Sequence, residues 1–289
     1  MSLVPDPLSS LDDLTRSNDV RPAWYLDLVL PEIGGGKMAV GDLGLIDETP
    51  QATALRVSGL DQQTFEALVT RFGAQFSGLY FWKCPRISDL SPMENLSNLR
   101  YVAFYWNQRA VRLWDLAKTP KLKGLQFDDF TRVHTLDDLA TAVSLEELAF
   151  GDQVWVKATF ESLEPLTHLQ DLQKLSFAVR RIDDARVQPL ATLRRLEVFE
   201  CPTNLFTTEQ LAWLRAHLPD STEGRVLLPV QKFTKPLVSG KDVLVMGKRK
   251  PWLNSSADAK RIQRYVENFE RLVERFQADP ELEPEVSRT

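Results

Sequence analysis

Few residues of this 289-residue chain occur in a spacing that could do chemistry. The run from Gly34 to Lys37 is glycine-rich, as phosphate-binding loops are. Such a loop needs a glycine five positions before its last glycine and a Ser or Thr directly after the lysine. Pro31 and Met38 stand at those two positions. We therefore interpret the run as a turn and predict no phosphate site there.

Metal-binding and nucleophilic motifs are equally hard to find. His134, His168 and His217 form no HExxH motif and no closely spaced set with cysteine. Cys84 and Cys201 are predicted to be buried structural thiols, and no serine lies in a G-x-S-x-G motif. We expect no metal, no cofactor and no catalysis. An enzyme with an unfamiliar site in the C-terminal region is the least favoured alternative.

Composition narrows the class of protein. The chain is 43% hydrophobic and 26% charged, which is typical of a globular protein. Its net charge of −5 argues against a general nucleic-acid binder, and Lys248-Arg249-Lys250 is interpreted as a solvated turn. No window approaches the ~18 apolar residues of a membrane span, and the first twenty residues lack the features of a secretory signal. These features predict a cytoplasmic protein with free thiols.

The elements that position side chains are internal repeats. The pattern apolar-x-x-apolar-x-apolar occurs seven times, with copies 21 to 27 residues apart. These intervals fall within the ~20–29 residues of leucine-rich repeats. The seven copies begin at Ala52, Phe76, Leu99, Leu122, Leu145, Leu172 and Leu193.

Each copy predicts a short strand with alternate side chains directed into a solenoid. In the last copy this pattern places Leu196 and Val198 inward and Phe199 outward. Further apolar residues close each repeat from the convex side, as we expect for Leu136, Leu139 and Val143. No repeat buries its apolar residues alone, so stacking must supply the core.

Two stretches carry a family resemblance. ISDLSPMENLSNL at 87–99 and SLEPLTHL at 162–169 resemble the repeats of internalins, a group of bacterial leucine-rich repeat proteins. The resemblance implies a horseshoe of about seven repeats, a bacterial origin and a protein that acts by binding. Only Asn107 matches the asparagine that the family usually carries after each strand. The other repeats have Leu60, Cys84, Phe130, Gln153, Arg180 and Cys201 there, and the long repeat after Leu145 is expected to bulge.

Three regions are predicted: an N-terminal cap at 1–51, the α/β solenoid at 52–219 and a C-terminal α+β extension at 220–289. The caps are expected to contain strands at 24–30, 225–230 and 242–246, and helices at 61–72, 208–218 and 256–277. Ser255 and Asp258 fit a capping box for the last helix. Its apolar stripe is predicted to dock on the two C-terminal strands, and the alternative is pairing with another chain. The stripe consists of Ile262, Val266, Phe269, Val273 and Phe276.

Outward-facing strand residues form the concave face on which solenoids bind their partners. Aromatic side chains of the kind enriched in binding hot spots gather on two neighbouring strands, with carboxylates beside them that suit a basic partner. The predicted partner-binding residues are Tyr80, Trp82, Tyr101, Tyr105, Trp106, Asp128, Asp129 and Asp152. The alternative is that the N-terminal cap covers the aromatics or that Trp106 turns into the core.

The sequence thus predicts a non-catalytic scaffold that binds another protein through its concave face. Inhibition or regulation of that partner is one role such a scaffold serves, and the sequence selects neither the role nor the partner. The main alternative is a homo-oligomeric assembly protein that associates through the C-terminal helix, so the oligomeric state stays open. No nucleic acid and no membrane is expected as a partner.

Overall fold

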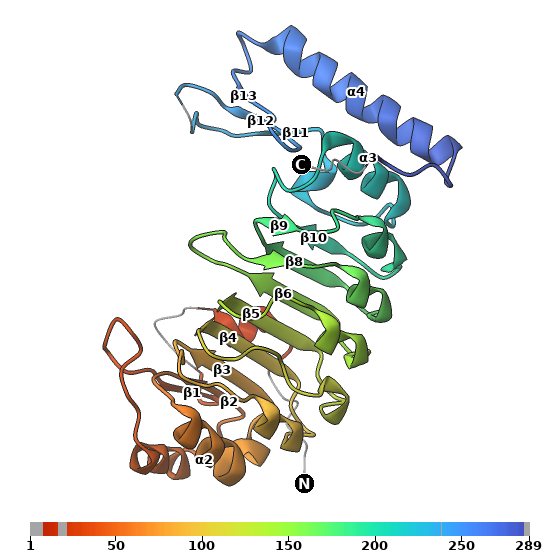
Figure 1. Cartoon of the computed structure of the whole chain (residues 1–289). Helices are drawn as coiled ribbons and strands as arrows, with labels where there is room; N and C mark the ends of the chain where they lie inside the picture. Colours follow the sequence, from red (N-terminus) through yellow and green to blue (C-terminus); the bar gives the residue numbers. More distant parts are fainter. Residues whose placement is uncertain (1–7, 17–21, 238, 286–289) are drawn as a thin grey trace.

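The chain folds into a stack of parallel strands that runs through most of the molecule (Figure 1). The structure is a computed structural model and describes residues 8–16, 22–237 and 239–285. Eight strands form the main sheet, and the neighbours in this sheet follow one another in the order of the sequence. They are β1 (Tyr25–Leu28), β2 (Ala54–Val57), β3 (Gly78–Trp82), β4 (Tyr101–Asn107), β5 (Gly124–Phe130), β6 (Glu147–Gly151), β8 (Lys174–Ala178) and β10 (Val198–Glu200).

The register of the strands confirms the leucine-rich repeat solenoid. Leu79, Val102 and Leu125 pair in line across β3, β4 and β5, and the apolar residue two positions later forms a second buried line. That second line is largely phenylalanine, and its rings stack along the solenoid with centroids 4.7 Å apart for Phe81 and Phe104. Identical spacing in successive repeats therefore produces a continuous core.

The last repeat corrects the sequence-based prediction. Phe199 pairs with Leu175 and is fully buried, so it faces the core and not the concave surface. Val198 pairs with Lys174 on the outer side of the sheet. The predicted register was wrong by three residues, because the turn before β10 also places a leucine at every third position. Leu193 and Leu196 are both buried, so either fits the start of the pattern.

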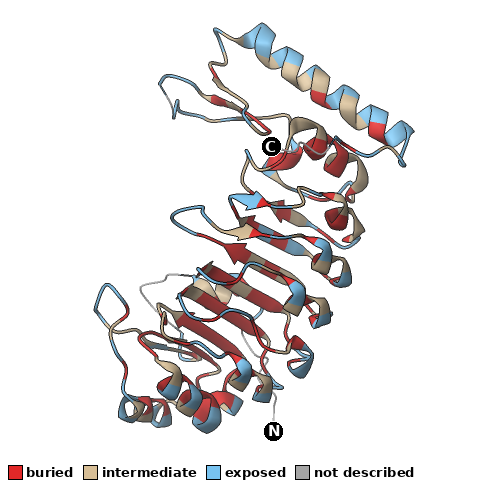
Figure 2. Ribbon diagram, viewed as in Figure 1, coloured by how far each residue is buried: buried red, intermediate tan, exposed pale blue. Residues whose placement is uncertain are grey.

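The convex side of the five repeats after the first consists of short 3-10 turns, one per repeat, whose inner residues are buried (Figure 2). Leu136 and Leu139 close their repeat as predicted. Val143 does not, because it is 60% exposed and Ala142 takes the inner position. The Ala142 N–H donates to the Leu139 carbonyl, which sets that turn. The turns are η3 (Ser91–Asn95), η4 (Leu116–Lys118), η5 (Asp137–Thr141), η6 (Glu164–His168) and η7 (Gln188–Thr192).

The long repeat after Leu145 bulges as predicted. After β6 the chain forms the loop 152–158 and then a short strand, β7 (Thr159–Phe160), which pairs with β9 (Arg181–Ile182). Phe160 enters the core against Phe150, at a centroid distance of 5.1 Å. Gln153 and Arg180, predicted at the asparagine position, are exposed, and these two repeats bury Phe160 and Val179 instead.

The N-terminal region contributes one strand and two helical elements to the cap. β1 confirms the predicted strand and extends the sheet beyond the first repeat. Asp61 caps α2 (Gln62–Phe72), its carboxylate accepting from the Thr64 N–H, as expected for the first repeat's helix. The cap also contains η1 (Val40–Glu48), and α1 (Leu11–Thr15) lies across the sheet. The turn η2 (Gly73–Gln75) follows α2 in the first repeat.

The C-terminal region begins with α3 (Thr208–His217), which confirms the predicted helix. A three-stranded antiparallel sheet follows, formed by β11 (Val230–Lys232), β12 (Val243–Val245) and β13 (Trp252–Leu253). The strand predicted at 225–230 was wrong, because Arg225–Leu227 forms the 3-10 turn η8. The predicted capping box was also wrong, because Ser255 donates its hydroxyl to Asp242 and α4 (Ala259–Ala278) begins after Asp258 without a side-chain cap.

The apolar stripe of α4 docks within the chain. Phe269 and Phe276 are buried in the main core, where α4 packs along α3. Ile262 and Tyr265 pack against the three-stranded sheet. The predicted docking surface was therefore only half of the observed one, since α3 supplies the rest. In the described part of the chain, no helix combines the length and apolarity that crossing a bilayer would require.

Candidate functional site

The first half of the concave face is covered by α1. Leu8, Leu11 and Leu14 project onto β3, β4 and β5. Two glycines make room for them. A Cβ on Gly78 would lie 2.4 Å from a Leu8 methyl carbon, and one on Gly124 would lie 2.8 Å from Leu11 Cγ. The sheet is therefore shaped to receive these leucines.

Hydrogen bonds fix both ends of α1. At its start, the Leu11 N–H donates to Glu147 Oε2 at 3.0 Å, and the Tyr101 hydroxyl donates to the Ser9 carbonyl at 2.6 Å. At its end, the Tyr25 hydroxyl donates to the Leu14 carbonyl at 2.6 Å. The segment is thus held by polar groups as well as by apolar contact.

This arrangement decides between the two alternatives for the aromatic residues on β3 and β4. Tyr80 and Tyr101 are buried in the cluster beneath α1, and burial raises the pKa of both hydroxyls. The N-terminal segment therefore crosses the concave face, the arrangement that the sequence left open. In this structure the two tyrosines contact the chain itself, and their role in partner binding stays a prediction.

Trp82 and Tyr105 lie at the margin of the covered area and are half-buried. Their ring centroids are 6.4 Å apart. Two cations flank Trp82: the Arg56 guanidinium lies 4.8 Å and the Lys83 ammonium 4.1 Å from its ring centroid. Lys83 also donates to the Ile33 carbonyl at 2.6 Å. Trp82 is therefore a fixed part of the surface, stabilised by cation–π contacts.

The predicted acidic residues do come together, mostly in hydrogen bonds within the chain. Asp128 is buried, and its carboxylate accepts from the side-chain amides of Gln126 and Gln153 at 2.5 and 2.7 Å. Burial raises the pKa of Asp128 to about 6 despite these two bonds, and the neighbouring Asp129 and Asp152 act in the same direction. Asp128 is therefore a buried, hydrogen-bonded group with little surface to offer a partner.

Asp152 holds the loop 152–158 in shape. Its carboxylate accepts from the N–H groups of Lys157 and Ala158 at 2.5 and 2.6 Å. Asp129 is half-buried beside it, and burial together with the Asp152 charge raises its pKa. Of the three predicted carboxylates, Asp129 is the one with appreciable exposure.

Beside these residues, at the carboxyl ends of β4, β5 and β6, the surface is hollowed by a cavity of about 640 Å³, here called the edge pocket. Its lining includes Tyr105 and Trp106, and also Val154 and Trp155 of the loop 152–158. Trp106 has a left-handed backbone conformation, with φ at 66°, and the next residue, Asn107, is buried. Trp106 thus stays half-exposed at the pocket and does not enter the core.

Trp155 is the binding candidate that the sequence reasoning missed. Its side chain is 72% exposed, and Val154 beside it is 62% exposed. Clustered exposed apolar side chains are typical of interaction sites. The sequence signal for it is the length of the repeat after Leu145, which by itself indicates only a bulge.

The remaining candidates for chemistry have structural roles. Cys84 and Cys201 are buried free thiols, and burial raises the pKa of both, that of Cys84 to about 12. The His217 ring stacks on Trp213 at a centroid distance of 4.0 Å. Among the described residues, no three His, Cys, Asp or Glu side chains are grouped so as to hold a metal ion.

Solved structures with a similar fold include two internalins, the family that the repeat sequence resembles. Internalin C2 of Listeria monocytogenes matches 56% of this chain and 66% of its own, with 23% identity and a TM-score of 0.44. Internalin F of the same species matches 69% of this chain and 65% of its own, with 16% identity and a TM-score of 0.41. A leucine-rich repeat protein of Leptospira interrogans matches 68% of this chain and 47% of its own, with 12% identity and a TM-score of 0.46.

This chain spans less than two thirds of the length of each of these structures. No family model and no curated protein matches the chain. The fold follows from the strand register, in which each repeat pairs in line with its neighbours.

Proposed function

We propose that this protein is a non-catalytic scaffold that binds a partner protein through the edge pocket. The observation that carries the proposal is that the exposed Trp155 and Val154 line one cavity together with Tyr105 and Trp106. Tryptophan and tyrosine offer a large rigid area at low entropic cost, so they dominate the energy of many interfaces. The pocket is on rigid strand ends on one side and on a carboxylate-held loop on the other.

The chemistry of the pocket indicates what the partner brings. Its aromatic walls suit an apolar side chain as the anchor. Asp129 suits a hydrogen-bond donor next to that anchor, while Lys83 and Lys157 in the lining balance the charges of Asp129 and Asp152. The sequence predicted three carboxylates that would face a basic partner. Asp128 and Asp152 are instead hydrogen-bonded within the chain, so Asp129 is the one we propose for this contact. Buried free thiols suit a reducing compartment, and we place the interaction in the cytoplasm as part of the proposal.

The alternatives receive less support. Assembly through α4 would need its apolar stripe, and Phe269 and Phe276 of that stripe are buried against this chain's own core. An enzyme in the C-terminal region would need a nucleophile or base facing a cavity. One cavity of that region is lined by Ser221 and Glu223, but among the described residues no histidine or cysteine lines it and no hydrogen bond joins Ser221 to a base.

A tagged pull-down from the native cell's lysate tests the proposal. The wild-type protein is compared with Trp106→Ala and Trp155→Ala, and with Val143→Ala as a control for an exposed apolar residue on the convex side. We expect one protein to be captured by the wild type and the control and to be lost with both tryptophan variants. Circular dichroism confirms that each variant is folded. Equal capture by all four proteins would refute the assignment to the edge pocket.

A further inference from the structure

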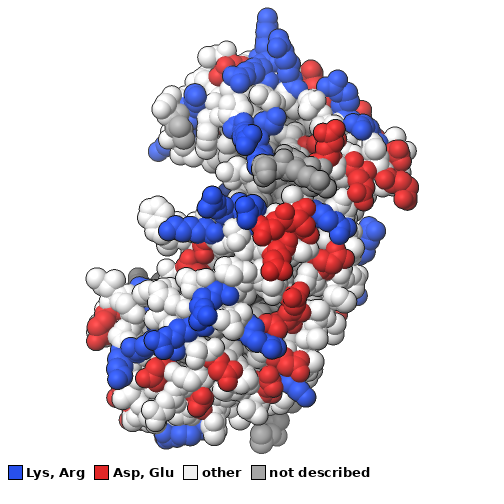
Figure 3. Space-filling model, viewed as in Figure 1, with Lys and Arg blue, Asp and Glu red and all other residues white. Residues whose placement is uncertain are grey.

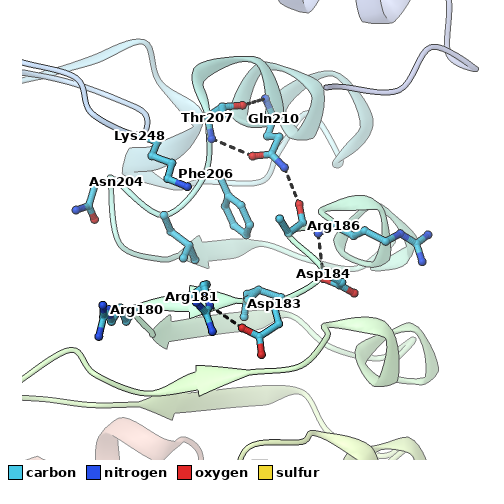
Figure 4. Close-up of a pocket in the computed structure, with 13 residues that line it drawn as sticks. Arg180, Arg181, Asp183, Asp184, Arg186, Asn204, Phe206, Thr207, Gln210 and Lys248 are labelled. Atoms are coloured by element: carbon cyan, nitrogen blue, oxygen red, sulfur yellow. Dashed lines mark hydrogen bonds and ion pairs between the residues drawn. The ribbon is translucent and has the colours of Figure 1, made fainter. Parts of the chain in front are cut away.

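A second cavity, of about 920 Å³, lies between the last repeats and the C-terminal region (Figure 4). We call it the basic notch. It is formed by the segment 180–186 around β9, the residues 204–207 that lead into α3, Gln210 and Lys248. Lys and Arg side chains stand on both sides of the hollow in the space-filling view (Figure 3). Its volume is within the range of small-ligand and peptide-anchor sites.

The charges around the notch are unequal. Four cations line it, Arg180, Arg181, Arg186 and Lys248, together with two carboxylates, Asp183 and Asp184. This leaves a formal excess of two positive charges in a chain whose net charge is −5. A concave surface of one sign raises the local concentration of ions of the other sign. The notch therefore favours an anion.

Two of the four cations form ion pairs with neighbouring carboxylates. Arg181 Nε donates to Asp183 Oδ1 at 2.6 Å, and the Arg186 guanidinium reaches Glu164 at 3.4 Å. Within the described residues, Arg180 and Lys248 have no carboxylate within ion-pair distance of their charged groups. Figure 4 shows Lys248 above the cavity and Arg180 below it. The two uncommitted charges thus face the same cavity from opposite sides.

The rest of the lining adds to this preference. α3 is ten residues long and begins at the notch, so the positive end of its dipole is directed there. Thr207 and Gln210 form a reciprocal capping box, and the Gln210 amide donates to the Ala185 carbonyl at 2.7 Å. This bond ties α3 to the segment 180–186. Ile182 and Phe206 are buried in the lining and give the notch an apolar floor.

We propose that the basic notch binds an acidic peptide segment of a partner protein, with carboxylates paired to Arg180 and Lys248. The positive excess is small, and Asp183 and Asp184 would repel a dense polyanion such as a nucleic acid. The apolar floor suits the aliphatic stems of glutamate side chains. This site does not overlap the edge pocket in its lining residues, so the inference stands independently of the function proposed above.

Fluorescence anisotropy with the full chain tests this proposal. The probe is a labelled peptide of alternating Glu and Gly residues, titrated at low salt. We expect the double variant Arg180→Gln, Lys248→Gln to bind at least about tenfold more weakly than the wild type. The matched control removes the same charges from convex turns, as Arg112→Gln, Lys118→Gln, and should bind like the wild type.

A charge-reversal variant makes the test independent of a simple loss of folding. Arg180→Glu, Lys248→Glu should lose the acidic peptide and acquire binding of a peptide of alternating Lys and Gly residues. The proposal is overturned if the wild type fails to bind the acidic peptide, or if the control pair weakens binding as much as the notch pair. It is also overturned if inorganic phosphate or a DNA duplex binds the wild type more tightly than the acidic peptide does.

Discussion

At the scale of single residues, Asp128 couples protonation to folding. Burial raises its pKa from 3.8 to about 6, so the folded state holds the proton more tightly than the unfolded chain does. Its contribution to the free energy of unfolding should therefore fall as the pH rises from about 4 to 6 and stay constant above that. A rise of this size in the pKa of Asp128 corresponds to a loss of up to about 3 kcal/mol in the free energy of unfolding. Asp128→Asn should abolish this decrease in the free energy of unfolding between about pH 4 and 6, and it should stabilise the protein at pH 7.

Urea unfolding at several pH values measures this effect. The matched control is Asp47→Asn, since Asp47 is exposed on the surface of the cap. The control should keep the wild-type pH dependence. An Asp128→Asn protein that retained the full decrease between pH 4 and 6 would show that another group is responsible.

Phe127 tests how much the ring stack contributes. It is fully buried and stacks on Phe150 with centroids 5.6 Å apart, in the middle of the solenoid. Phe127→Ala should lower the free energy of unfolding by about 3–5 kcal/mol, because it removes buried area and leaves a cavity. Val111→Ala, at a position 53% exposed, should change it by less than about 0.5 kcal/mol. Urea denaturation of both variants checks the difference.

At the scale of elements, α1 depends on the glycines beneath it. Gly124→Val places carbon atoms where Leu11 and the Tyr101 ring now lie, so α1 should lift from the sheet. Trypsin should then cleave after Arg16, which ends α1, roughly tenfold faster or more, since losing about 1.4 kcal/mol multiplies the open population by ten. Gly44→Val is the control, because its Cβ would meet no atom within 4 Å.

A second variant separates release of α1 from damage to the sheet. Leu11→Asp leaves every strand unchanged but places a charge in the apolar contact, so it should accelerate cleavage after Arg16 in the same way. Unchanged cleavage in both folded variants would mean that α1 is held by contacts other than these.

Several elements were predictable from the sequence because their periods are strict. The spacing of Leu125 and Phe127 is enough to predict the position and the inward face of β5. The same two positions of each repeat predict the neighbouring strands. The last repeat failed because Leu193 and Leu196 satisfy the same pattern in two registers. The position of α1 could not be predicted. Gly78 and Gly124 make room for Leu8 and Leu11, and these leucines are far from the two glycines in the sequence. The same is true of Trp155, whose exposure depends on a loop that one carboxylate, Asp152, shapes.

At the scale of the whole molecule, the stacking of repeats leaves two ends that must be closed. β1 and α2 close the first, and α3 with α4 closes the second (Figure 1). Phe276 is fully buried and Phe269 nearly so, so α4 is part of the core that begins in the repeats. Because α4 already covers this end, the full chain should be a monomer.

Light scattering after size exclusion should therefore give a mass near 32.9 kDa over a wide range of concentrations.

Removing the chain from Leu253 onward should produce aggregates, because it uncovers the face of α3 that packs against α4. The double variant Phe269→Ala, Phe276→Ala should loosen α4 and lower the free energy of unfolding, while Glu267→Ala on the exposed side of the helix should change neither mass nor stability. A stable dimer of the full chain that dissociates in the double phenylalanine variant would instead show that these residues join two copies, and assembly would replace capping as the role of α4.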